Sequence, residues 1–234
     1  MTTPKKAAPN LDTLALTRRQ LHVIIILDCS GSMAGDRIAS LNYALRSSVP
    51  ELKEVARENP EIEVLVRVLS FSSTADWLIE TPVPVGEWSW QDVAAGGDTH
   101  LGDALDAVEA SLNADVMPGR QLPPVIVLAS DGYPSDDFEA GLQRFLANDF
   151  AKAAVRRAIA IGGDADLEVL QMVINHASLR PLRANIAPDL VEFIKWATTA
   201  PVKAASQPTG ADDPQSALAG QLEQFSAEDT DIVW

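Results

Sequence analysis

Residues 21–33 read LHVIIILDCSGSM, and this stretch decides the fold. The five residues 23–27 are all apolar and mostly β-branched, which is typical of a strand that is buried on both faces. Asp28, Ser30 and Ser32 follow at intervals of two, so one short loop carries a carboxylate and two hydroxyls. Mg²⁺ prefers hard oxygen ligands of this kind. The sequence therefore predicts a divalent-metal site at the end of a buried strand.

Strand and helix patterns alternate along the rest of the chain. Short apolar or alternating runs predict five further strands, at residues 61–72, 76–85, 125–129, 153–161 and 182–186. Apolar residues at helical spacing predict helices at residues 35–58, 101–112, 138–148, 167–174 and 189–200. We expect Pro50 to kink the first helix or to split it in two. Either Asp98 or Thr99 is expected to cap the second helix.

This alternation predicts an α/β fold. We expect a doubly wound, mostly parallel central sheet with one antiparallel edge strand and with helices on both faces. The antiparallel strand is expected at residues 76–85, because Pro82 and Pro84 lack the donors that an interior strand needs and are tolerated at a sheet edge.

The chain is expected to divide into three parts, a flexible N-terminal arm at 1–20, one folded domain at 21–200, and an acidic linker and tail at 201–234. From residue 201 onward, six acidic residues stand against one basic residue. Aliphatic and aromatic side chains are scattered among these acids, and the last of them is Trp234. Such a segment is either inert or a short docking peptide for a basic, grooved partner.

Two further loops carry oxygen ligands that match those after the first strand. Thr99 lies in GGDTHLGDAL, residues 96–105, just before a predicted helix. Asp131 follows the predicted strand 125–129 in the sequence LASDG. Because parallel strands end at the same edge of a sheet, these loops can converge on the loop that follows the first strand. Each motif alone is common, and their combination in this order is what points to one site.

DCSGSM, GGDTHLGDAL and LASDG together resemble the metal-ion-dependent adhesion site of von Willebrand factor A domains, and the resemblance covers residues 21–200. The sequence is more narrowly similar to the TerY-like proteins, an intracellular bacterial group found with tellurite-resistance genes. This narrower similarity depends on VLSFSS at 68–73, on GGDTHLGDAL, and on SDGYPSDD at 130–137.

The resemblance implies a set of metal ligands, which are Asp28, Ser30, Ser32, Thr99 and Asp131. It implies Mg²⁺ as the metal, with Ca²⁺ or Mn²⁺ as alternatives. Since two carboxylates and neutral hydroxyls leave residual positive charge on the metal, an open coordination position would take a carboxylate from a partner protein. Candidate partner contacts are Asp98, His100, Tyr133, Asp136 and Trp234.

Composition and charge indicate where in the cell the protein works and which class of partner it binds. The formal net charge of −15 argues against nucleic acid, which needs a basic face. No apolar run approaches the length of a membrane span, and the N-terminus shows no secretory signal, so we expect a cytoplasmic protein without membrane contact. Cys29 is the single cysteine and is expected to point into the core. His22 and His176 have no partner at metal spacing and are expected to be structural.

The first functional hypothesis is a protein-interaction module without enzymatic activity, because no serine–histidine pairing or GxSxG motif is recognisable. The TerY-like resemblance implies a protein kinase and a metal-dependent phosphatase as partners in stress or defence signalling. One alternative is a subunit that works with a ring ATPase in trans, since the chain has no GxxxxGK[ST] loop. Another is a phosphatase with Asp28 as nucleophile, although Ser30 stands where such enzymes usually carry a second aspartate.

Overall fold

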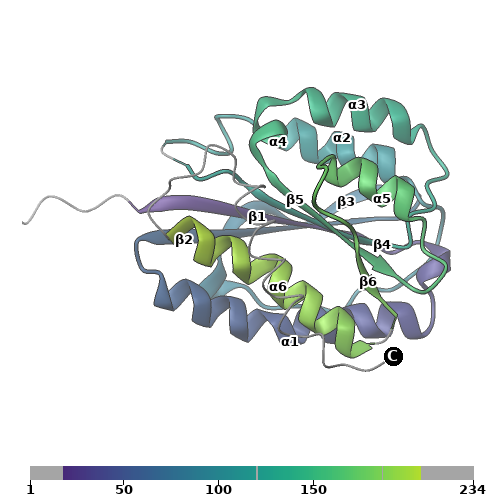
Figure 1. Ribbon diagram of the computed structural model, residues 1–234, viewed down its shortest axis with the longest axis horizontal. Helices are drawn as coiled ribbons and strands as arrows, with labels where there is room; N and C mark the ends of the chain where they lie inside the picture. Colours follow the sequence, from purple (N-terminus) through teal and green to yellow (C-terminus); the bar gives the residue numbers. More distant parts are fainter. Residues whose placement is uncertain (1–17, 120, 186, 207–234) are drawn as a thin grey trace, which may run out of the picture.

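The computed structural model describes residues 18–119, 121–185 and 187–206, and its centre is one six-stranded sheet (Figure 1). The strands are β1 (Arg19–Asp28), β2 (Ile62–Phe71), β3 (Ala75–Pro84), β4 (Val125–Ser130), β5 (Val155–Ile161) and β6 (Leu182–Ala184). Their order in the sheet is β3-β2-β1-β4-β5-β6. Every neighbouring pair is parallel except β2 and β3. The predicted sheet, mostly parallel with one antiparallel edge strand, is therefore confirmed.

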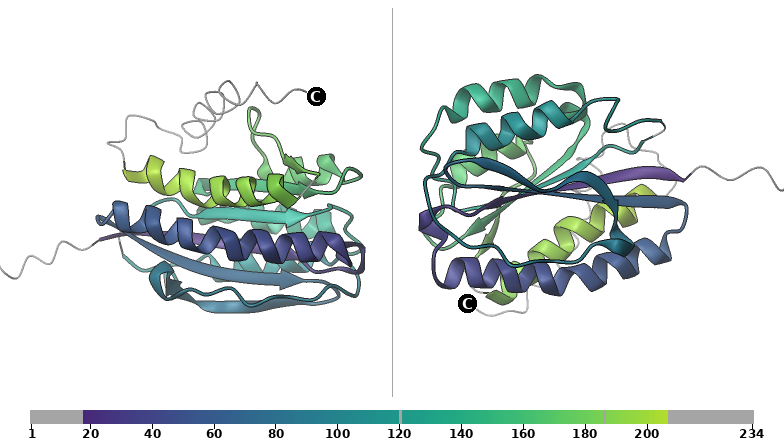
Figure 2. Two further views of the ribbon diagram at one scale, coloured as in Figure 1. Left: turned by 90° about the horizontal axis from the view of Figure 1, so that it is seen from below. Right: turned by 180° about the vertical axis from the view of Figure 1, so that it is seen from behind.

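Helices cover both faces of this sheet, as predicted (Figures 1 and 2). One face carries α1 (Asp36–Glu58) and α6 (Ala187–Ser206). The other carries α2 (Leu101–Ser111), α3 (Phe138–Ala147), α4 (Asp149–Ala153) and α5 (Leu167–Ile174). Within the described residues, none of these helices is both long enough and apolar enough to cross a membrane.

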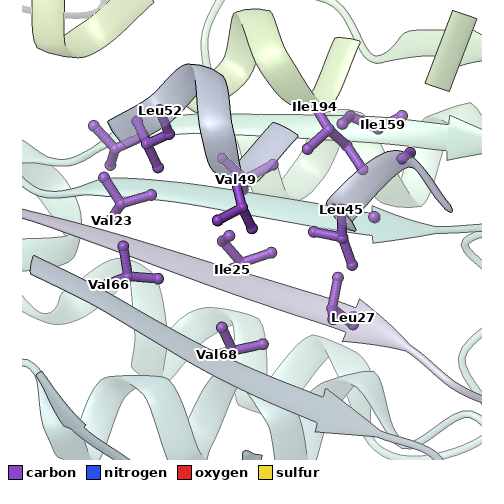
Figure 3. Packing of buried hydrophobic residues seen from close by; sticks show 14 of the residues in the cluster. Val23, Ile25, Leu27, Leu45, Val49, Leu52, Val66, Val68, Ile159 and Ile194 are labelled. Atoms are coloured by element: carbon purple, nitrogen blue, oxygen red, sulfur yellow. The ribbon is translucent and has the colours of Figure 1, made fainter. Parts of the chain in front are cut away.

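β1 is the central strand and contributes to both cores. Val23, Ile25 and Leu27 point to the layer of α1 and α6, where Figure 3 shows them facing side chains of α1. Ile24 and Ile26 point to the opposite layer. All five are essentially inaccessible to water, and each contributes roughly 1.5–3 kcal/mol on burial. Packing on both faces explains why an uninterrupted apolar run forms this strand.

Pro50 does not split the first helix, because α1 runs without a break from Asp36 to Glu58. Pro50 and Arg46 are both exposed, so water can bond the Arg46 carbonyl, which lacks its helical donor. Val49 and Leu52, on either side of the proline, are buried in the same core. Their packing holds both halves of the helix on the sheet.

The last helix extends beyond its predicted end at residue 200. α6 continues to Ser206, since Leu190, Ile194, Thr198 and Val202 recur every four residues and are all buried. The domain boundary drawn at residue 200 therefore falls inside a helix. At the other end β1 begins at Arg19, inside the predicted arm. The remainder of the arm, 1–17, and of the tail, 207–234, lies outside the described residues.

The cap of α2 comes from a distant residue. Neither Asp98 nor Thr99 caps this helix, whose N-cap is His100 without a side-chain cap bond. Instead, the backbone N–H of Asp103 donates to Asp136 Oδ2 at 2.9 Å. The helices α2 and α3 approach closely here, because a Cβ on Gly141 would lie 2.5 Å from the Gly102 carbonyl oxygen. The hydrogen bond to Asp136 and the close approach of the two helices together hold the loop before α2 against the loop after β4.

Candidate metal centre

The first candidate ligand, Asp28, is the last residue of β1 and is fully buried. Its Oδ1 accepts a hydrogen bond from the Ser30 backbone N–H at 2.9 Å. Its Oδ2 accepts one from the Ser130 hydroxyl at 2.6 Å, which ties the ends of β1 and β4 together. Ser30 Oγ lies 3.0 Å from Ser32 Oγ across the short 3-10 turn at Gly31–Met33. The three oxygen-bearing side chains of this loop are thus gathered on one turn.

Thr99 is brought to this loop by backbone hydrogen bonds. The Gly31 N–H donates to the Gly97 carbonyl at 2.9 Å, and the Gly96 N–H donates to the Cys29 carbonyl at 2.8 Å. Thr99 is buried, and its own N–H donates to the Ser135 hydroxyl at 3.0 Å. The loop that carries Thr99 is therefore held between the loops that follow β1 and β4.

Asp131 follows β4 directly and is also fully buried. Its Oδ2 accepts a hydrogen bond from Arg37 Nη1 at 3.1 Å. Its Oδ1 is buried and has no hydrogen-bond partner among the described residues. Since a buried carboxylate oxygen without a partner is costly, this atom marks a place where a donor or a cation would be stabilising.

The electrostatics of the two aspartates favour a cation. Burial raises the pKa of Asp28, and the nearby negative charge of Asp131 raises it further, against hydrogen bonds from Ser130 and Ser30 that lower it. The described residues hold no group of three or more His, Cys, Asp or Glu side chains suited to a metal. A set of two carboxylates and three hydroxyls lies outside that pattern and has the hard-oxygen chemistry that Mg²⁺ prefers. The residues present therefore fit the metal that the sequence predicts.

Solved structures with the same arrangement of strands and helices identify the fold. Von Willebrand factor type A from Catenulispora acidiphila is 17% identical with a TM-score of 0.58, over 77% of this chain and 42% of that one. The ArnB paralog VWA2 from Sulfolobus acidocaldarius is 18% identical with a TM-score of 0.55, over 74% and 44%. This chain has a von Willebrand factor A-type fold. It spans less than half the length of these two proteins.

A third protein with the von Willebrand factor A-type fold is matched almost over its full length. BatB from Bacteroides thetaiotaomicron is 14% identical with a TM-score of 0.53, over 77% of this chain and 98% of that one. No protein-family model and no curated protein matches the sequence. At identities this low, the likeness establishes the fold and leaves metal binding and the TerY-like resemblance untested.

Two residues at the site of this von Willebrand factor A-type fold were not predicted. Ser130 orients Asp28, and its position directly before Asp131 was the only signal in the sequence. Arg37 lies in the first turn of α1, bonds Asp131, and also pairs with Asp164 in the loop after β5. No sequence pattern links Arg37 to residues so far along the chain.

Four of the five predicted partner contacts lie near the candidate ligands, and all four make hydrogen bonds within the fold. Asp98 is exposed and bonds Ser73. His100 Nδ1 lies 3.1 Å from Asp103 Oδ2.

The other three predicted contacts differ in accessibility. Tyr133 is half exposed, and its hydroxyl donates to the Asp164 carbonyl. Asp136 caps α2, so its carboxylate already accepts a hydrogen bond within the fold. Trp234 lies outside the described residues. Of the four described contacts, Asp98 and Tyr133 are the most accessible.

A groove of about 570 Å³ adjoins the candidate metal centre at Arg37. It runs between the start of α1, the ends of β5 and β6, and the start of α6, with Tyr43 and Asn185 on its walls. Arg37, which bonds Asp131, thus links the groove to the candidate metal centre.

Proposed function

We propose that this chain is a cytoplasmic, metal-dependent protein-interaction module that acts without catalysis. In this proposal Mg²⁺, or Ca²⁺ or Mn²⁺ in its place, is held by Asp28, Ser30, Ser32, Thr99 and Asp131. When bound, the ion supplies a Lewis-acidic position for one carboxylate oxygen of a partner protein. The observation that carries the proposal is the pair of fully buried carboxylates, Asp28 and Asp131, with one Asp131 oxygen left without a partner.

The surroundings of Asp28 favour binding over the phosphatase alternative. A nucleophilic carboxylate needs an oxygen that is open to the substrate. Both oxygens of Asp28 accept a hydrogen bond, which leaves each a lone pair for a cation, but the buried side chain is not open to an incoming substrate. His100, the histidine closest in sequence to a candidate ligand, is engaged by Asp103 rather than by a hydroxyl nucleophile. These contacts support the proposal that the protein is not an enzyme.

The TerY-like resemblance supports a more specific setting. We propose that the partners are a protein kinase and a metal-dependent phosphatase in a bacterial stress or defence pathway. A ring ATPase acting in trans is the alternative setting. In either case an aspartate or glutamate of the partner meets the metal, and its neighbouring residues lie along the groove between α1 and α6.

Metal binding is tested by calorimetric titration of the full chain with MgCl₂, CaCl₂ and MnCl₂. We expect one site, and at a free metal concentration about 100 times Kd a rise of about 2.7 kcal/mol in the free energy of unfolding. Asp131→Asn, which keeps the shape of the side chain but removes its charge, is expected to abolish both effects. Ser32→Ala, at an exposed position, is expected to weaken binding without impairing folding.

Asp92→Asn is the matched control, because Asp92 is an exposed carboxylate paired with Arg46 rather than a candidate ligand. It should bind metal as the unaltered chain does. Absence of binding by the unaltered chain, or undiminished binding by both ligand variants, would contradict the proposed site.

Partner binding is tested by capture from the native host with the full chain as bait, in Mg²⁺ and in chelator. We expect a partner that is retained only in Mg²⁺ and is lost with Asp28→Ala, since the metal bridges the two proteins. Recovery of a kinase or phosphatase would support the signalling setting, and recovery of a ring ATPase would support the alternative. A partner that stays bound in chelator would show that the metal does not form the bridge.

A further inference from the structure

A second surface groove lies between α5 and β6, apart from the candidate ligands. It consists of two adjoining hollows of about 500 and 430 Å³, which share Gln171 and Arg180. Figure 1 shows α5 and β6 next to each other at the β6 edge of the sheet. The walls of the groove include the apolar side chains of Leu167, Met172 and Pro181. This α5–β6 groove therefore offers apolar contact at an edge of the fold.

The α5–β6 groove carries two positive charges that no acidic side chain of the described residues pairs. Arg180 and Arg183 line it, are exposed, and have no ion-pair or hydrogen-bond partner among the described residues. By contrast, the exposed arginines Arg46, Arg57 and Arg144 are each paired with a carboxylate. One acidic side chain, Glu168, lies among the residues that line the groove.

Two unpaired cations thus line one hollow in a chain of net charge −15. Close to them lies Met172, which leaves 42% of its surface exposed. Unpaired guanidinium groups beside exposed apolar surface suit a ligand that is both acidic and apolar.

We propose that the α5–β6 groove binds the C-terminal segment of this same chain, residues 207–234. This segment contains six acidic residues and no lysine, arginine or histidine. It also contains large apolar residues, which are Leu218, Leu222, Phe225, Ile232, Val233 and Trp234. The segment thus complements the groove in charge and in apolar content.

The length of the segment allows the contact within one molecule. α6 packs against β6 and β5 and ends at Ser206, and its 20 residues span about 30 Å. The 28 residues that follow reach up to about 90 Å when extended. The C-terminal segment is therefore long enough to return along α6 to the groove.

Electrostatics favour binding within one chain over binding between copies. Two copies, each of net charge −15, repel one another as they approach. A tethered segment avoids this encounter and has an effective concentration on the order of millimolar. The inference does not depend on metal binding, so it can fail or succeed independently of the proposed function.

The contact is tested in the full chain by paramagnetic broadening. A nitroxide is attached to a cysteine added after Trp234, and the methionine methyl groups are labelled with ¹³C. Cys29 does not compete for the label, because it is buried and burial raises its pKa to about 12. Met172 lines the groove, whereas Met33 and Met117 are buried and report that the fold is intact.

We expect the Met172 methyl signal to lose most of its intensity and to recover it when the nitroxide is reduced. The double variant Arg180→Glu and Arg183→Glu should abolish the loss. High salt should weaken the loss as well, because the Debye length falls to about 3 Å at 1 M. A matched double variant, Arg57→Glu and Arg144→Glu, makes the same charge change at paired positions and should leave the loss unchanged.

Three outcomes would overturn the inference. One is a Met172 signal that the nitroxide does not affect at low salt. Another is equal behaviour of the two double variants, with salt having no effect. The third is broadening when the ¹³C label and the nitroxide are on different molecules, which would assign the groove to a second copy.

Discussion

Arg157→Met is expected to raise the free energy of unfolding by about 1–3 kcal/mol. Arg157 lies in β5 with 1% of its surface exposed, and none of its three side-chain nitrogens has a hydrogen-bond partner among the described residues. Its guanidinium lies over the Trp196 ring, whose centroid is 4.7 Å from Cζ. Burial lowers the pKa of Arg157 to about 10.

Holding the charged form of Arg157 in this environment costs about 3 kcal/mol, because one pH unit corresponds to about 1.4 kcal/mol. The cation–π contact with Trp196 offsets up to about 2 kcal/mol of this cost. Methionine fills a similar volume without a charge, and replacing buried charges by apolar groups is often stabilising by about 1–4 kcal/mol. Urea denaturation at neutral pH measures the change.

Arg156→Met is the matched control for this experiment. Arg156 is the preceding residue of β5, is also buried, and faces the opposite core. Its guanidinium donates to the carbonyls of Ile174 and Ala151, so its removal leaves two buried acceptors without these donors. We expect Arg156→Met to destabilise the fold. If Arg157→Met were destabilising as well, the contact of Arg157 with Trp196 would have to outweigh the cost of burying its charge.

The order of strands and helices follows from short-range patterns, so it could be predicted from the sequence. The run 23–27 could be recognised as a buried strand because its residues pack on both faces of the sheet. Features that depend on tertiary contacts could not be predicted from such patterns. Pro50 remains inside a helix because Val49 and Leu52 pack on either side of it. The cap of α2 comes from Asp136, 33 residues further along the chain.

The candidate site shows the same division. Asp28 and Asp131 were found because each directly follows a buried strand, and parallel strands end at one edge. Arg37 was missed, because its contact with Asp131 spans 94 residues and no local pattern specifies it. The signal for the extension of α6 was present, since Val202 continues a spacing of four from Leu190. It was obscured by Pro201 and by the small residues that follow it, which are typical of a linker.

His22 is expected to make the fold sensitive to acid. It lies in β1 with 1% of its surface exposed, and both ring nitrogens lack hydrogen-bond partners among the described residues. Burial, and then the charge of Arg67, lowers the pKa of His22 from 6.5 to about 4. Between these values the unfolded chain binds a proton that the folded chain does not. Stability due to neutral His22 is therefore complete above pH 6.5 and is lost as the pH falls to 4.

The loss attributable to His22 amounts to about 3 kcal/mol, because one pH unit corresponds to about 1.4 kcal/mol. We expect His22→Leu to remove this part of the pH dependence, so that its free energy of unfolding falls about 3 kcal/mol less between pH 7 and pH 4. Carboxylates titrate in the same range, but they are common to both chains and cancel in the difference. Ile24→Val alters the same face of β1 without an ionisable group and should cost about 1 kcal/mol at every pH. Parallel pH profiles for His22→Leu and the unaltered chain would show that His22 does not titrate on unfolding as its burial requires.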